Sequence, residues 1–207
     1  PVICIGNLTV GGTGKTPHTE YLIKLLQHLC VNVATLSRGY KRKSKGYVLA
    51  DAHSDASRIG DEPYQMKSKF PGIRVAVDED RCHGIEQLLK LDNPPVDVVL
   101  LDDAFQHRYV KAGLNILLTD YHRLLCDDAL LPAGRLREPA GGKNRAQIVI
   151  DEVSGKHQAD RLQHHHEAAA SVSLPAIVFL HVALWHPYSR VPPEGRERQD
   201  VFFFRGR

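Results

Sequence analysis

Short runs of apolar residues alternate along the chain with stretches whose apolar residues recur at helical spacing. The predicted strands are the apolar runs at residues 2–5, 31–36, 73–77, 96–101, 114–119 and 147–150, with an extended piece at 46–50. The predicted helices begin at Pro17 and cover residues 63–69 and 81–91. Strands that alternate with helices in this way are typical of a parallel sheet with helices on both faces. We therefore predict an α/β fold whose ligands bind where the strands end.

The first predicted strand leads into a glycine-rich turn with a lysine and a threonine at the start of the following helix. This turn consists of Thr9, Val10, Gly11, Gly12, Thr13, Gly14, Lys15 and Thr16. Glycines let backbone N–H groups approach phosphate oxygens closely, and a helix N-terminus adds partial positive charge. In such a loop, Lys15 reaches the β- and γ-phosphates and the Thr16 hydroxyl ligates Mg²⁺. We predict that all eight residues bind ATP in a P-loop NTPase-like fold.

One position of this loop departs from the usual spacing, which asks for glycine where Thr9 stands. The alternative interpretation is a glycine-rich turn with an incidental lysine. The strand, the glycines, the Lys-Thr pair and the first-turn proline together favour the phosphate-binding interpretation.

Two pairs of carboxylates follow predicted strands or turns. Asp102 and Asp103 end the apolar run 96–101, where an aspartate can hold Mg²⁺ directly or through its water, opposite Thr16. The alternative is an aspartate pair that simply ends a strand. Asp61 and Glu62 follow a glycine, and a kinase that acts on an alcohol needs a carboxylate near the acceptor hydroxyl. From spacing alone, the favoured role of Asp61 is to cap the helix that follows.

A loop over residues 133–139 carries Arg135 and Arg137, whose guanidinium groups suit phosphate or carboxylate recognition or lie solvated at the surface. Net charge is only +3, which fits an anionic substrate or membrane surface and does not require nucleic acid. The four cysteines lie far apart and form no C-x-x-C pair, so reduced thiols are expected. Asn-Lys-x-Asp, which reads guanine, does not occur, and this disfavours a GTPase.

Five segments within residues 1–150 together resemble one kinase family, and they occur in the family's order. They are GNLTVGGTGKTP, LSRGY (36–40), GDEP (60–63), DDAFQH (102–107) and LLPAGRLREP (130–139). In these segments the chain resembles the tetraacyldisaccharide 4'-kinases of lipid A biosynthesis. The resemblance also disfavours a P-loop ligase or a metallochaperone GTPase.

The resemblance implies ATP-dependent, Mg²⁺-assisted phosphorylation of the 4' hydroxyl of a tetraacylated glucosamine disaccharide 1-phosphate. It implies a peripheral protein on the cytoplasmic face of the bacterial inner membrane, with the lipid A disaccharide precursor and the membrane surface as partners and no nucleic acid. It implies catalytic roles for Lys15, for Asp61 near the acceptor hydroxyl and for Glu62 beside it. It also implies catalytic roles for Arg137 and Glu138 near the reacting centre. Asp102 and Asp103 would surround Mg²⁺.

Some family features are not found in this sequence. Ala104 stands where the family usually has glycine, and neither the family's hydrophobic N-terminal helix nor its Asp-His-His motif occurs. We expect further residues to precede Pro1. We predict an N-terminal kinase lobe over residues 1–150, followed by a non-family tail over residues 151–207, in place of the second lobe.

The predicted tail contains a His triplet and Pro/Arg-rich stretches, and its strand–helix rhythm fades. One hypothesis is that it is an out-of-frame product, which the nucleotide sequence tests; a metal site or a linker are the alternatives for the triplet. The leading function is therefore the 4'-kinase, here as a defective fragment. The alternative is a nucleotide-binding P-loop module without catalytic activity.

Overall fold

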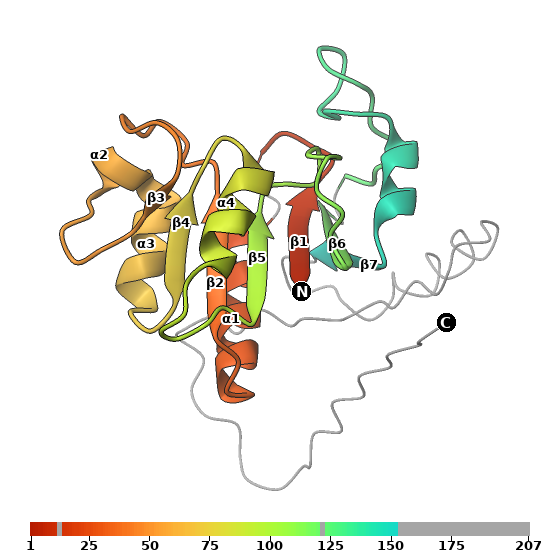
Figure 1. Ribbon diagram of the computed structural model, residues 1–207. Coiled ribbons are helices and arrows are strands. Elements are labelled where there is room, and N and C mark those ends of the chain that lie inside the picture. Colours follow the sequence, from red (N-terminus) through yellow and green to blue (C-terminus); the bar gives the residue numbers. More distant parts are fainter. Residues whose placement is uncertain (12–13, 121–122, 153–207) are drawn as a thin grey trace, which may run out of the picture.

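The computed structural model describes residues 1–11, 14–120 and 123–152, which form a seven-stranded sheet with helices packed on it (Figure 1). The strands are β1 (Val2–Asn7), β2 (Val33–Ser37), β3 (Val48–Leu49), β4 (Arg74–Val77), β5 (Val98–Asp102), β6 (Leu114–Asp120) and β7 (Ile148–Glu152). Their order is β3-β4-β2-β5-β1-β6-β7. All neighbours are parallel except β3, a two-residue edge strand that runs antiparallel to β4. The predicted parallel sheet is confirmed.

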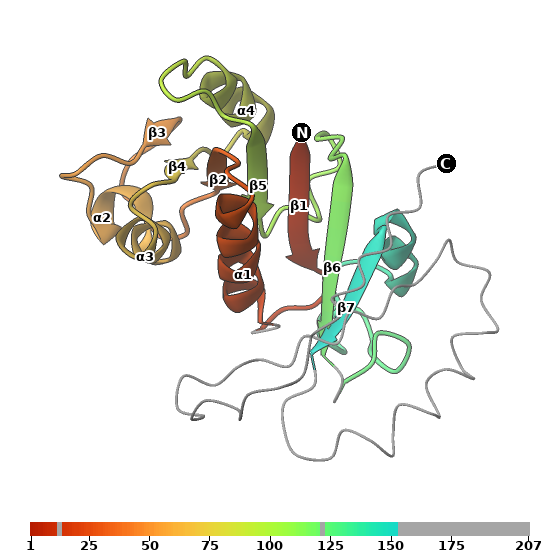
Figure 2. The ribbon, with the colours of Figure 1, turned by 90° about the horizontal axis from the view of Figure 1, so that it is seen from below.

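Four α-helices and one 3₁₀-helix accompany the described sheet. They are α1 (Lys15–His28), α2 (Ala56–Ile59), α3 (Asp61–Lys69), α4 (Arg81–Leu89) and the 3₁₀-helix η1 (Ala140–Arg145). Figure 2 shows α4 on one face of the sheet and α1 and α3 on the other, as predicted. Helix α1 begins two residues before the predicted start at Pro17. The first turn of a helix has no N–H partners within the helix, so a proline there costs no hydrogen bond.

Two helices are fixed at their starts by aspartate side chains. Asp55 accepts a hydrogen bond from the Arg58 N–H and caps α2, a single turn that the apolar pattern does not predict. Asp80 accepts from the N–H groups of Cys82 and His83 and caps α4. Each cap satisfies backbone donors that the helix itself leaves free.

The core lies on both sides of the sheet, because successive side chains of a strand point to opposite faces. On the face that α4 covers, Leu88 packs with Leu36 and Leu101. On the opposite face, Ile23 of α1 packs against a cluster that includes Leu100. Central strands buried on both faces read as continuous apolar runs, and this explains the pattern in the sequence.

Parallel pairing brings the ends of the central strands to one edge of the sheet. Strand β1 lies between β5 and β6, and β2 lies on the other side of β5. The glycine-rich loop after β1, the Ser-Arg-Gly-Tyr segment after β2 and the aspartate pair at the end of β5 therefore meet at this edge. Ligands of open α/β sheets bind at such an edge.

The burial of Leu100 predicts its contribution to stability. Its side chain is fully buried in the central strand β5, whereas Leu89 at the end of α4 is 59% exposed. Leu100→Ala should lower the free energy of unfolding by about 2–5 kcal/mol, and Leu89→Ala by no more than about 0.5 kcal/mol. Urea unfolding followed by circular dichroism measures both; equal losses for the two variants would contradict this placement of the core.

Candidate active site

The described part of the loop between β1 and α1 uses glycines in a backbone conformation that other residues rarely adopt. Gly11 (φ 118°) and Gly14 (φ 66°) adopt left-handed conformations that suit glycine. His18 Nδ1 lies 2.8 Å from the carbonyl oxygen of Gly14, and the Thr19 hydroxyl donates to the carbonyl oxygen of Lys15 at 3.0 Å. Side chains of α1 thus fix its own first turn, which begins at Lys15. Residues 12 and 13, two of the predicted phosphate-binding positions, lie outside the described residues.

The arginine-rich segment pairs with the first residues of this loop. The Val10 N–H donates to the carbonyl oxygen of Arg135 at 2.8 Å, and the Arg137 N–H donates to that of Leu8 at 2.7 Å. Together these two bonds form an isolated antiparallel bridge between Thr9 and Leu136. The Val10 N–H is therefore already occupied, and the pairing holds Arg137 beside the phosphate loop.

A cavity of about 510 Å³ lies at the strand ends next to this loop. Among the predicted site residues, it is lined by Lys15, Glu62, Asp102, Asp103 and Arg137. The sequence does not assign site roles to the other lining residues, most of them polar, although all but Arg81 lie in the segments that carry the resemblance: Ser37, Arg38, Gly39, Tyr40, Arg81, Gln106 and His107. Residues from six separate segments of the chain thus form one site.

Two cations converge on one carboxylate in this cavity. Lys15 Nζ lies 3.5 Å from Asp103 Oδ1, and Arg137 Nη1 lies 3.1 Å from both carboxylate oxygens of Asp103. Asp103 follows β5 with a φ of 48°, a left-handed conformation that costs a residue with a side chain of the order of 1–3 kcal/mol. The site thus holds a strained aspartate between the two cations expected to bind phosphate.

Asp102 differs from its neighbour because it is buried. Burial, and then the negative charges of Glu62 and Asp103, raise the pKa of Asp102 to about 7, against the charge of Lys15. Its Oδ1 atom is buried and has no hydrogen-bond partner among the described residues. An orphaned carboxylate oxygen of this kind fits a metal ligand. The described residues contain no group of three or more His, Cys, Asp or Glu placed to hold a metal ion by themselves, but Mg²⁺ in phosphate sites needs only one or two carboxylates besides phosphate and water.

The two glycine motifs SRGY and GDEP pack directly against each other. A Cβ atom on Gly39 would lie 2.7 Å from the carbonyl oxygen of Ile59, and one on Gly60 would lie 3.0 Å from that of Tyr40. Both glycines also have left-handed φ values, 70° and 94°. This close backbone contact brings the start of α3 to the cavity.

Helix α3 begins with Asp61 and Glu62, but they lie differently with respect to the cavity. Both are exposed, but Glu62 lines the cavity and its charge raises the pKa of Asp102, whereas Asp61 is not among the lining residues. Thr16, the second residue of α1, is also not among them. The roles predicted for Asp61 and Thr16 therefore stay predictions.

Glu138, predicted to lie near the reacting centre, is not among the residues that line the cavity. It is buried, and it is paired with Arg108 and Arg145. Burial acts to raise the pKa of Glu138, but the hydrogen bonds from Arg145 and Arg108 outweigh it and hold the pKa below its usual value. Glu138 is therefore ionised at neutral pH.

Two cationic residues of the cavity have no role predicted from the sequence: Arg38, which follows β2, and Arg81, the first residue of α4. Arg81 is buried and lines the cavity, and its Nε has no hydrogen-bond partner among the described residues. Burial, Arg81 and Arg38 lower the pKa of His107. A signal was present in the sequence, because Arg81 comes shortly after a predicted strand, where parallel strands place ligand-binding residues.

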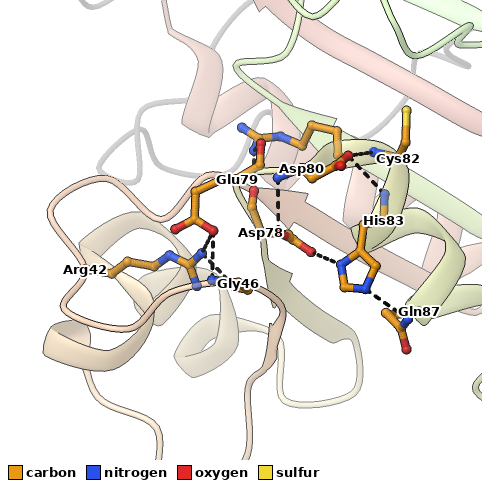
Figure 3. A network of polar contacts seen from close by, with 9 residues as sticks. Arg42, Gly46, Asp78, Glu79, Asp80, Cys82, His83 and Gln87 are labelled. Atoms are coloured by element: carbon orange, nitrogen blue, oxygen red, sulfur yellow. Dashed lines mark hydrogen bonds and ion pairs between the residues drawn. The ribbon is translucent and has the colours of Figure 1, made fainter.

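A polar network fixes the loop after β2 to the loop after β4 (Figure 3). Arg42 Nη2 lies 2.7 Å from Glu79 Oε2, and the Gly46 N–H donates to the same oxygen at 2.9 Å. Next to them, His83 Nδ1 lies 2.7 Å from Asp78 Oδ2. The loop after β2 thus has a defined position next to the loop that leads from β4 to Arg81.

The raised pKa of Asp102 predicts a pH dependence of stability. The folded chain binds this proton more tightly than the unfolded chain, whose carboxyl titrates at 3.8. Without divalent cations, the contribution of Asp102 to the free energy of unfolding should therefore fall as pH rises from about 4 to about 7. Urea unfolding across this range should show that Asp102→Asn removes this contribution, and that the exposed control Asp127→Asn keeps it. Parallel curves for Asp102→Asn and the unmodified chain would contradict the assignment.

Comparisons with known proteins match the chain to one kinase family. The family model for LpxK, tetraacyldisaccharide-1-P 4'-kinase, matches residues 1–192. The tetraacyldisaccharide 4'-kinase of Bacteroides fragilis is 79% identical over 150 residues, which are 72% of this chain and 40% of that relative. That of Flavobacterium johnsoniae is 56% identical over 163 residues, 79% of this chain and 47% of the relative.

A solved structure gives the same result. The crystal structure of "apo" form LpxK from Aquifex aeolicus in complex with ATP is 44% identical in sequence, with a TM-score of 0.65. The match covers 73% of this chain and 47% of that one, so the chain spans less than half the length of these three relatives. Apart from the end of β7, the predicted tail lies outside the described residues, and the predicted lobe boundary stays a prediction. The chain belongs to the tetraacyldisaccharide-1-phosphate 4'-kinase family.

Proposed function

We propose that this chain binds Mg·ATP and forms the nucleotide-binding part of a kinase that phosphorylates the 4' hydroxyl of a tetraacylated disaccharide 1-phosphate. The observation that carries the proposal is the convergence of Lys15 and Arg137 on Asp103, beside the orphaned oxygen of buried Asp102, in one cavity. The ATP in the Aquifex aeolicus structure and the names of the relatives support it.

Binding of the triphosphate falls to the phosphate loop and two side chains. Backbone N–H groups at the start of α1 bind phosphate oxygens, with the positive end of the helix behind them. Lys15 and Arg137 neutralise the charge that develops on the transferred group. Each has Asp103 as its partner in the cavity, which orients both side chains before the nucleotide arrives.

The metal site of this proposal centres on the two aspartates. Asp102 and Asp103, with the hydroxyl of Thr16, would hold Mg²⁺, which supplies charge neutralisation between the phosphates when bound. Asp102 must lose its proton to act as a ligand, and a nearby cation favours the ionised carboxylate. The pKa of about 7 in the structure therefore describes the site before a cation binds.

The acceptor side of the site lies at the start of α3. We propose that Asp61 or its neighbour Glu62 accepts the proton of the sugar hydroxyl as that hydroxyl attacks the γ-phosphate in line. Arg38 and Arg81 also line the cavity and suit the anionic groups of the acceptor.

We further propose that the chain works at the cytoplasmic face of the inner membrane as a peripheral protein. The support is the chemistry of the acceptor, whose four acyl chains hold it in a bilayer. No helix in the described part of the chain is long and apolar enough to cross a membrane.

A second candidate is a nucleotide-binding module that binds Mg·ATP and transfers nothing. One observation favours it: Asp61, which the resemblance places near the acceptor hydroxyl, is not among the residues that line the cavity. Transfer of labelled γ-phosphate to the lipid acceptor, measured beside a calorimetric titration with Mg·ATP, separates the two. Binding without transfer selects the module, and transfer selects the kinase.

Lys15 provides the sharpest test of the site. Lys15→Ala should weaken Mg·ATP binding and, where the chain transfers phosphate, lower the rate by about 10²–10³, since it removes a cation from the developing charge. Lys24→Ala is the matched control, because Lys24 is an exposed lysine of the same helix. A Lys15→Ala chain that binds and transfers like the control would refute the role of Lys15, and no binding by the folded unmodified chain would refute both candidates.

A further inference from the structure

Arg145, at the end of η1, connects two loops of the site without lining the cavity itself. Its guanidinium forms a two-pronged pair with Glu138: Nη1 lies 2.9 Å from Oε2 and Nη2 lies 2.7 Å from Oε1. Nη2 also donates to the carbonyl oxygen of Phe105 at 3.1 Å, and the guanidinium carbon lies 4.6 Å from the centre of the Phe105 ring. A planar fork and a cation–π contact together are geometry that lysine does not reproduce.

Glu138 also bonds two side chains of the loop after β5. Its buried carboxylate also accepts hydrogen bonds from Arg108 Nη2 at 2.8 Å and from Gln106 Nε2 at 3.3 Å. A buried charge is tolerated when it is paired and fully hydrogen-bonded, as here. The carboxylate is therefore a fixed acceptor to which side chains of the loop after β5 are attached.

Gln106 connects Glu138 to Arg137, which lines the cavity. Its Nε2 also donates to the carbonyl oxygen of Asn7, the last residue of β1, at 2.8 Å. Its Oε1 lies 3.4 Å from Arg137 Nη1, the nitrogen that bonds both oxygens of Asp103. A continuous series of contacts thus runs from Arg145 through Glu138, Gln106 and Arg137 to Asp103.

We propose that Arg145 is a positioning residue for phosphate binding: through Glu138 and Gln106 it sets the direction of Arg137 toward Asp103. This inference rests on the function proposed above, because it concerns the same nucleotide site. Arg145 touches neither the nucleotide nor the cavity and acts through Arg137.

A side chain at Gly142 of η1 would disturb the Glu138–Arg145 pair without changing any charge. A Cβ atom on Gly142 would lie 3.0 Å from the carboxyl carbon and from Oε2 of Glu138, and 3.2 Å from Arg145 Nη1. A Cβ atom on the adjacent Gly141 would have nothing within 4 Å. Gly142→Ala therefore pushes on the Glu138–Arg145 pair, and Gly141→Ala makes the same backbone change in the same helix without contact.

The first experiment is a double-mutant cycle on Mg·ATP affinity. Arg145→Lys, Arg137→Ala and the combined variant are titrated by calorimetry, well below the unfolding temperature and after circular dichroism has shown that each is folded. Arg145→Lys should weaken binding by about tenfold in the unmodified background, a size typical of coupled neighbours. It should change affinity by less than about twofold when Arg137 is already alanine. The proposal is overturned if the combined variant loses affinity by the product of the two single losses. It is also overturned if Arg145→Lys binds Mg·ATP like the unmodified chain.

The glycine pair keeps the proposal testable where Arg145→Lys does not fold. Gly142→Ala should weaken Mg·ATP binding several-fold, and Gly141→Ala should leave it unchanged. Equal affinities for these two variants overturn the proposal. Arg58→Ala removes an exposed ion pair far along the chain and should have no effect on affinity, so it controls for a general loss of charge.

A structural measurement separates failure of this inference from failure of the proposed function. If the unmodified chain does not bind Mg·ATP, the proposed function fails. Crystal structures of Gly142→Ala and Gly141→Ala then decide the positioning role alone. Arg137 should leave Asp103 in the first and stay in the second, and an unmoved Arg137 in both overturns the inference.

Discussion

Parallel pairing of β1 with β5 is the constraint on which the site depends. The register places Ile5 of β1 opposite Asp102, the last residue of β5, so the aspartate pair ends beside the strand that leads into the phosphate loop. Paired positions 97 residues apart in the sequence are thereby held in neighbouring, hydrogen-bonded strands. The other contributions to the site, from the ends of β2 and β4 and from the arginine-rich segment, are arranged around this pair.

Two features of the site are unfavourable for folding, and the buried core offsets them. Asp102 sits in a buried position near two other carboxylates, which raises its pKa, and Asp103 adopts a left-handed backbone. Neither feature stabilises the fold, and strain of this kind is characteristic of functional positions. A divalent cation next to Asp102 would favour its ionised form, so the arrangement is suited to the complex with Mg·ATP more than to the free protein.

The sequence predicts the elements better than it predicts the site. The apolar runs predict the central strands, because strands buried on both faces are recognisable locally. The phosphate loop, the aspartate pair and Arg137 are predictable because each lies in a compact motif. Arg81 and Gln106 are harder to assign, because a polar residue in a loop looks like a surface residue until the topology places it. The burial of Glu138 depends on contacts with Gln106 and Arg108, some thirty residues away along the chain, and no local pattern encodes it.

Side chains bonded to the buried Glu138 hold two loops of the site in place, as backbone hydrogen bonds do for the helices and strands. Between β5 and β6 no helix or strand occurs, and in the described residues between β6 and β7 the one regular element is η1. The loops that carry Gln106 and Arg137 therefore lack a continuous ladder of backbone hydrogen bonds to hold them. Two arginines and a glutamine on one buried carboxylate connect these loops to each other and, through Gln106, to the end of β1. Because a buried ion pair is strongly directional, it fixes the orientation of side chains as well as the position of the loops.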